Sequence, residues 1–163
     1  GIYTFVETAK RMPSDSYYFV MAGKTYMNGE EQRYVLDNFS HRANCFYYRE
    51  NISTEADFNR FIEISAVIYA AYVDFSQSSN MFAKASLFEK PLIVSKGYYM
   101  EEVIKKYALG IAILQDSVKE CMEAIIGLST WHCSRNSCQK YLATHSRENL
   151  FPAFRQLLSF HGK

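Results

Sequence analysis

The sequence predicts a doubly wound α/β fold, in which helices cover both faces of a parallel β-sheet. Short and nearly continuous apolar runs alternate along the chain with stretches in which apolar residues recur every three or four positions. A continuous apolar run is typical of a strand that is buried on both faces, and the longer period is typical of an amphipathic helix. The 163 residues have the length of one domain, and no shift in composition divides them.

The predicted elements follow one another regularly. Strands are predicted at residues 17–21, 45–48, 66–70, 92–94 and 111–114. Helices are predicted around residues 35–39, 58–62, 81–85, 103–107 and 118–126, with two closing helices around 138–141 and 149–158. Ser53 or Thr54 can cap the helix around residue 58. Ser117 and Glu120 form a capping box, and Gly110 is predicted to end the helix before it.

The first element is a helix with no strand before it, because Ile2, Phe5, Val6 and Ala9 form a helical stripe. In a β-α-β arrangement each such helix follows a strand. We therefore expect residues 1–163 to be a single domain from the C-terminal part of a longer protein, without its preceding strand and N-terminal half.

Composition and charge exclude several classes of protein. The 18 basic and 17 acidic residues leave a net charge of +1, so we expect no nucleic acid as a partner. No apolar run approaches the ~20 residues of a membrane span. Four cysteines fit a reducing compartment, and the spacing of His132, Cys133 and Cys138 matches a zinc site only loosely. We expect a surface turn there and no metal.

Polar and basic residues follow several of the predicted strands. In an open parallel sheet, ligands bind outside the carboxyl ends of the strands. Ser76, Ser78, Ser79 and Asn80 lead directly into the predicted helix at 81–85, whose free backbone N–H groups can bind an anion. The basic residues that could add charge are Lys24, Arg49, Lys84 and Lys96. The pattern predicts a phosphorylated ligand, although Gly-x-Gly-x-x-Gly and Gly-x4-Gly-Lys-[Ser/Thr] motifs are absent from the sequence.

Three stretches, residues 19–24, 85–95 and 99–113, together resemble a known family. The first ends in Ala22-Gly23, the second has Lys90-Pro91 before an apolar strand that ends in Ser95, and the third runs from Glu-Val to Leu109-Gly110. This series resembles the C-terminal, donor-binding domain of group 1 glycosyltransferases of the GT-B fold, and it extends to about residue 128. The resemblance implies a Rossmann-like domain that forms one half of such an enzyme.

The resemblance also implies a donor site, residue by residue. The two glutamates of the family, eight positions apart, correspond here to Ser76 and Lys84. Backbone groups that hold the donor diphosphate in the family correspond to Ser78, Ser79 and Asn80, and Lys84 is expected to pair with a phosphate. Further positions of the expected donor site are Gly23 and Lys24 near the diphosphate or sugar, and Tyr47, Tyr48 and Arg49 near the base.

The activity that the resemblance implies is transfer of a sugar from a nucleoside diphosphate to the hydroxyl of an acceptor saccharide or lipid-linked saccharide. No metal or other cofactor is expected, and the missing N-terminal domain is expected to supply most acceptor contacts. The implied setting is bacterial surface polysaccharide synthesis in the cytoplasm, with at most peripheral contact with the inner face of the membrane. Two alternatives stay open: a nucleotide-sugar epimerase of the same fold, and a non-catalytic α/β interaction module.

Overall fold

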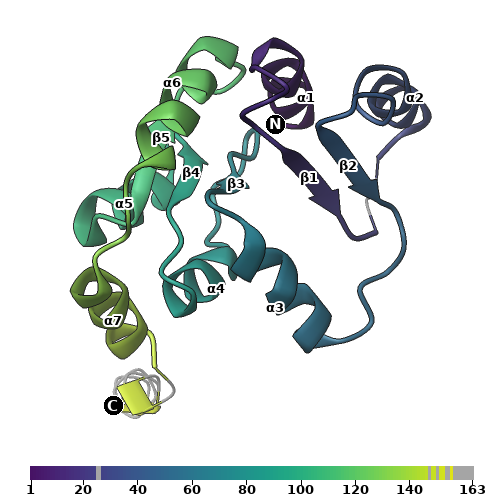
Figure 1. The fold of residues 1–163 in the computed structure, drawn as a ribbon. Coiled ribbons are helices and arrows are strands. Elements are labelled where there is room, and N and C mark those ends of the chain that lie inside the picture. Colours follow the sequence, from purple (N-terminus) through teal and green to yellow (C-terminus); the bar gives the residue numbers. More distant parts are fainter. Residues whose placement is uncertain (25–26, 147, 150, 153–154, 156–163) are drawn as a thin grey trace.

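The structure is a computed structural model that describes all residues of 1–163 except 25–26, 147, 150, 153–154 and 156–163. Helices and strands alternate along the described chain (Figure 1). The elements are α1 (Ile2–Arg11), β1 (Phe19–Ala22), α2 (Gly29–Asn38), β2 (Cys45–Tyr48), α3 (Glu55–Ile64), β3 (Ile68–Ala70), α4 (Met81–Leu87), β4 (Leu92–Ser95), α5 (Tyr99–Tyr107), β5 (Gly110–Ile113), α6 (Val118–Ser129) and α7 (Arg135–Thr144). These elements confirm the predicted strands and helices. Of the last predicted helix, residues 150, 153–154 and 156–158 lie outside the described residues.

The strands form two parallel sheets. β1 pairs with β2, and a separate three-stranded sheet has the order β3-β4-β5. The predicted α/β class with parallel strands is confirmed, but the expectation of one continuous sheet is not, since no ladder joins β1 to β3 within the described part of the chain. Sequence patterns identify strands one at a time, whereas the pairing of strands depends on contacts between distant segments.

Helices cover both faces of the three-stranded sheet, as predicted. One face packs against α4, α5 and α7 through side chains such as Leu92, Phe82 and Tyr141. The other face packs against α6, where Ile93 and Cys121 share a second buried cluster. All four residues of β4 are therefore buried.

The two-stranded sheet is covered on one face only. Phe19 and Cys45 pack against α1 and α2, but Val20 and Phe46, which point to the opposite face, are 37% and 53% exposed. From α3, Phe61 reaches this second face at Tyr48, with ring centroids 5.8 Å apart. The expectation that helices cover both faces is wrong for these two strands.

The helix ends agree with the predicted signals in part. Thr54, not Ser53, caps α3 by accepting a hydrogen bond from the Asp57 N–H at 3.0 Å. Ser117 accepts from the Glu120 N–H at 3.2 Å, which is one half of the predicted capping box, but the Glu120 carboxylate accepts from the Leu114 N–H at 2.9 Å and not from that of Ser117. Gly110 does not end α5, because the left-handed cap is Ala108. Gly110 instead begins β5, where a Cβ atom would lie 1.9 Å from the Leu92 carbonyl oxygen.

The expected surface turn at residues 134–137 is exposed at Ser134, Arg135 and Asn136, as predicted, although Arg135 already begins helix α7. The two thiols beside it, those of Cys133 and Cys138, are buried. Cys133 precedes the cap residue Ser134, and Cys138 lies one turn into α7. Their sulfur atoms are 2.8 Å apart, which is the contact of a hydrophobic staple. Burial raises the pKa of the Cys133 thiol to about 12. No group of three or more metal-binding side chains occurs among the described residues.

Candidate functional site

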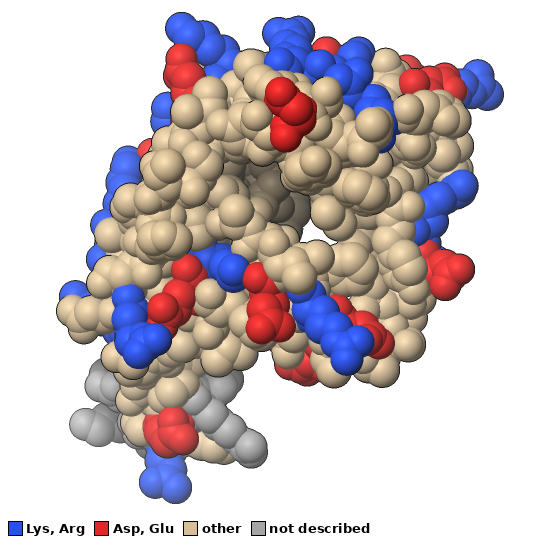
Figure 2. All heavy atoms as spheres, in the orientation of Figure 1, with Lys and Arg blue, Asp and Glu red and all other residues tan. Residues whose placement is uncertain are grey.

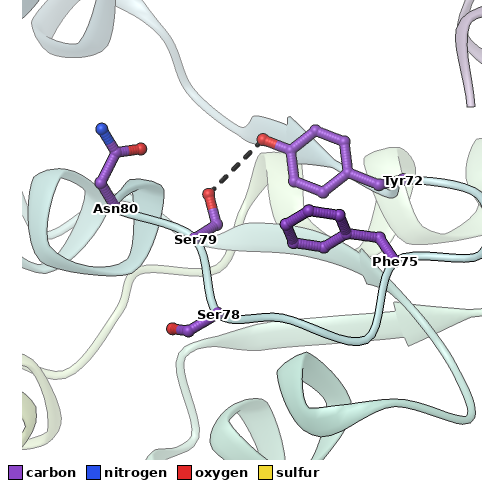
Figure 3. Close-up of a pocket in the computed structure, with 5 residues that line it drawn as sticks. All are labelled: Tyr72, Phe75, Ser78, Ser79 and Asn80. Carbon is purple, nitrogen blue, oxygen red and sulfur yellow. Dashed lines mark hydrogen bonds between the residues drawn. The ribbon is translucent and has the colours of Figure 1, made fainter.

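The loop between β3 and α4 lines a pocket of about 380 Å³ (Figure 3). Its lining residues are Tyr72, Phe75, Ser78, Ser79 and Asn80. The Tyr72 and Phe75 rings meet edge to face with centroids 4.9 Å apart, and the Tyr72 hydroxyl lies 3.5 Å from the Ser79 hydroxyl. The pocket thus combines an aromatic wall with hydroxyl and amide groups, and none of its lining residues is charged.

Hydrogen bonds to the carboxyl ends of the neighbouring strands hold this loop. The Ser95 hydroxyl, at the end of β4, donates to the Tyr72 carbonyl oxygen. The Asp74 N–H donates to the side chain of Gln115, just after β5, at 3.2 Å. The Asp74 carboxylate in turn accepts from the Tyr98 hydroxyl at 3.1 Å. The loop therefore lies at the edge of the sheet where parallel α/β proteins bind ligands.

The residues before α4 adopt only part of the expected anion-binding arrangement. Asn80 makes no side-chain cap, and the Ser79 hydroxyl accepts from the Met81 N–H at 3.2 Å. Within the described residues, the backbone N–H groups of Ser78, Ser79 and Asn80 have no acceptor. α4 has only seven residues, so its dipole adds little, and an anion here would depend on these individual N–H groups.

Lys84 lies outside the pocket lining. Its ammonium group pairs with the Glu55 carboxylate and donates to the Asn59 side-chain oxygen at 3.0 Å. Both partners belong to α3, so Lys84 fastens α4 to α3 in this structure. The hydrogen bond from Lys84 lowers the pKa of the Glu55 carboxyl group. Ser76, which matches the first glutamate of the family, is exposed and also outside the lining.

The other expected donor residues lie at the two-stranded sheet. Gly23 follows β1 with φ +104° and donates its N–H to the Tyr48 carbonyl oxygen at 3.0 Å. The Arg49 guanidinium lies over the Tyr47 ring, 5.8 Å from its centroid, and Tyr47 packs partly against the core beneath α1 and α2. Lys24 is exposed next to Gly23. The structure therefore divides the expected site into two groups of residues, one at each sheet.

Lys96, like Lys84, forms an ion pair with a carboxylate of another element. Its ammonium group pairs with the Glu120 carboxylate at 2.8 Å, and the same carboxylate accepts from the Leu114 N–H at 2.9 Å. These two hydrogen bonds lower the pKa of the Glu120 carboxyl group. The expectation that Lys96 adds charge to a ligand site gives way to a structural role, because the ion pair joins the end of β4 to the start of α6.

The sequence interpretation placed Asp74, Phe75 and Gln115 among the residues that follow predicted strands, but it gave them no specific role. Phe75 is a single aromatic residue in a polar stretch, so no period marks it. Asp74 has φ +50°, which cannot be read from the residue type. Gln115 was among the residues that follow a predicted strand, and this position was the only available signal for its role.

Within the described residues, no helix combines the length and the apolar content that a membrane span requires. No protein-family model, curated protein or solved structure matches this chain.

Proposed function

We propose that this chain is the donor-binding domain of a glycosyltransferase, and that it holds a nucleoside-diphosphate sugar during transfer of the sugar to an acceptor hydroxyl. The observation that supports the proposal best is the pocket at Tyr72 and Ser78–Asn80, which lies at the carboxyl edge of a parallel sheet. The sequence resemblance places the donor diphosphate at the same three residues.

The backbone of the pocket suits a diphosphate. Three successive residues, Ser78, Ser79 and Asn80, have N–H groups with no acceptor in the described part of the chain. Such fixed donors stabilise the negative charge that develops on a departing diphosphate, without reorganising during the reaction. The Ser79 hydroxyl, 3.5 Å from that of Tyr72, adds a further polar contact at the pocket wall.

The remaining donor groups in this proposal are Gly23, Lys24, Tyr47 and Arg49. In the proposal, Arg49 and Lys24 supply positive charge from positions that follow β2 and β1, and Lys24 is exposed. Lys84 has a supporting role, because its pairing with Glu55 fixes the helix that follows the pocket. A phosphate that used Lys84 directly would displace this carboxylate.

Calorimetry of the intact protein with UDP-, GDP- and TDP-sugars tests the proposal. We expect binding of at least one of them, weakened by at least ~10-fold in the Asn80→Asp variant because a new carboxylate repels the diphosphate. Asn80 is exposed and its side chain makes no cap, so the substitution leaves the fold unchanged. Ser14→Asp is the matched control, since Ser14 is exposed in the loop between α1 and β1. Failure of the intact protein to bind any nucleotide sugar would contradict the proposal.

A non-catalytic interaction module is the second candidate, and one observation favours it. Tyr18, Val20 and Phe46 expose an apolar face on the two-stranded sheet that another protein could cover. The same calorimetric panel separates the candidates. An interaction module binds none of the sugars, a transferase binds one and transfers it, and an epimerase isomerises it without an acceptor.

A further inference from the structure

Among the strands that the structure describes, none pairs with one edge of β1. In a parallel ladder, the peptide groups of alternate residues point to the same neighbouring strand. Phe19 and Gly23 donate their N–H groups toward β2, to Asn44 at 2.8 Å and to Tyr48 at 3.0 Å. The peptide groups of Val20 and Ala22 therefore point away from β2, toward the side of β3.

The facing edge of β3 is also unpaired. The Ile68 N–H donates to the Pro91 carbonyl oxygen at 2.9 Å, so Ile68 and Ala70 point toward β4. The peptide groups of Tyr69 and Ala71 consequently point toward β1. Among the described residues, no other strand pairs with either edge. Figure 1 shows β1 and β3 on the two sides of the centre of the molecule, and Figure 2 shows a hollow in the surface there.

Gly1 lies beside this gap, where α1 begins. The Tyr69 hydroxyl donates to the Gly1 carbonyl oxygen at 2.9 Å, and a Cβ atom on Gly1 would lie 1.8 Å from the Ala71 carbonyl oxygen. The start of α1 is thus fixed at the carboxyl end of β3 (Figure 1).

We propose that the gap between β1 and β3 binds one further parallel strand, formed by residues that precede Gly1 in a longer form of this polypeptide. That strand would end beside β3, lead into α1, and be followed across α1 by β1, which is the right-handed crossover of parallel sheets. The two sheets would become one, in the order β2-β1-new strand-β3-β4-β5. The inference depends on the strand edges alone and holds whatever the pocket binds.

The completed sheet also explains the position of the pocket. Chain connections run outward in one direction from the new strand to β1 and β2, and in the other direction from β3 to β5. The strand order would therefore reverse between the new strand and β3, where doubly wound proteins form their binding crevice. The loop with Tyr72 and Ser79 follows β3 and lies at this position.

Amide hydrogen exchange, compared between residues 1–163 and the same chain with roughly ten native residues before Gly1, tests the proposal. We expect the amides of Val20, Ala22 and Tyr69 to exchange at least ~10-fold more slowly in the longer chain, because they gain acceptors. Met21 and Ala70 are matched controls in the same strands, since their peptide groups already face β2 and β4.

The Val20→Pro substitution gives a second readout. The Val20 N–H has no acceptor within the described part of residues 1–163, so the substitution lowers the melting temperature of this chain only slightly. In the longer chain the substitution removes a ladder hydrogen bond, so the melting temperature falls clearly. Unchanged exchange at Val20 and Tyr69 in the longer chain would overturn the proposal, as would a native polypeptide that begins at Gly1. Slower exchange only at concentrations where the longer chain dimerises would assign the gap to a second copy and overturn it as well.

Discussion

The two sheets of this protein are built from similar apolar runs but bury them differently. β4 is buried at all four positions because α4, α5 and α7 cover one face of its sheet and α6 covers the other. β1 and β2 instead alternate between buried and exposed residues, since α1 and α2 cover only one face. A continuous apolar run therefore shows that a strand can be buried on both faces, and the surrounding helices decide whether it is.

The largest expected effect is a difference in the free energy of unfolding between a substitution at each sheet. Phe82, on α4 beneath the three-stranded sheet, is fully buried, whereas Phe46 on β2 is 53% exposed. We expect Phe82→Ala to lower the free energy of unfolding by about 3–5 kcal/mol, because it leaves a cavity. Phe46→Ala should cost less than ~1 kcal/mol, since little buried area is lost. Urea denaturation measures both, and equal losses would show that the exposed face of β2 is covered in solution.

A smaller effect is expected where β5 joins β4. Gly110 has φ +154°, and a Cβ atom there would lie 1.9 Å from the Leu92 carbonyl oxygen, so Gly110→Ala must push the two strands apart. We expect a loss of about 2–3 kcal/mol. Gly127→Ala is the matched control, because no atom lies within 4 Å of its Cβ position in α6 and alanine favours the helix by up to ~1 kcal/mol. If thermal denaturation showed Gly110→Ala to be as stable as the wild type, the close approach of β5 to β4 would be refuted.

The smallest effect concerns the ion pair between β4 and α6. Hydrogen bonds from Lys96 and the Leu114 N–H hold the pKa of Glu120 below its ordinary value of 4.5. A carboxyl group with a lowered pKa in the folded state stabilises the protein above the unfolded pKa. This stability is lost as the pH falls from about 4.5 through the folded-state pKa. Glu120→Gln should therefore make the melting temperature less dependent on pH in this range.

Glu123→Gln provides the control for the pH series. Glu123 is on the same helix, and its one ion pair among the described residues is with the exposed Lys119, at 3.9 Å. We expect its removal to leave the slope of melting temperature against pH close to that of the wild type. A slope reduced as much as in Glu120→Gln would place the acid-sensitive contact elsewhere in α6.

The sequence was sufficient for the elements and insufficient for their pairing. The change between short apolar runs and helical spacing located β1 through β5 and most helices, because these periods are local. The separation of β1 from β3 involves residues such as Val20 and Tyr69, which are far apart in the chain, and no local pattern encodes it. Gly110 was wrongly predicted to end α5, because the close contact with Leu92 that requires a glycine there is also nonlocal.

The candidate site could likewise be predicted from the sequence only in part. Ser78, Ser79 and Asn80 were found because they precede a helix after a strand, and the pocket includes all three. Lys84 was interpreted as a ligand group, yet its position is decided by Glu55, on a different helix. The direction in which a long charged side chain points depends on such partners, so its role could not be derived from spacing alone.

The unpaired edge of β1 beside the exposed Val20 and Phe46 has a practical consequence for solution work. An open strand edge next to apolar side chains is a template on which further copies of a chain can add, so association should increase with protein concentration. Light scattering across a dilution series would report this before any change in circular dichroism, and the dilute end of the series is where stability is best measured.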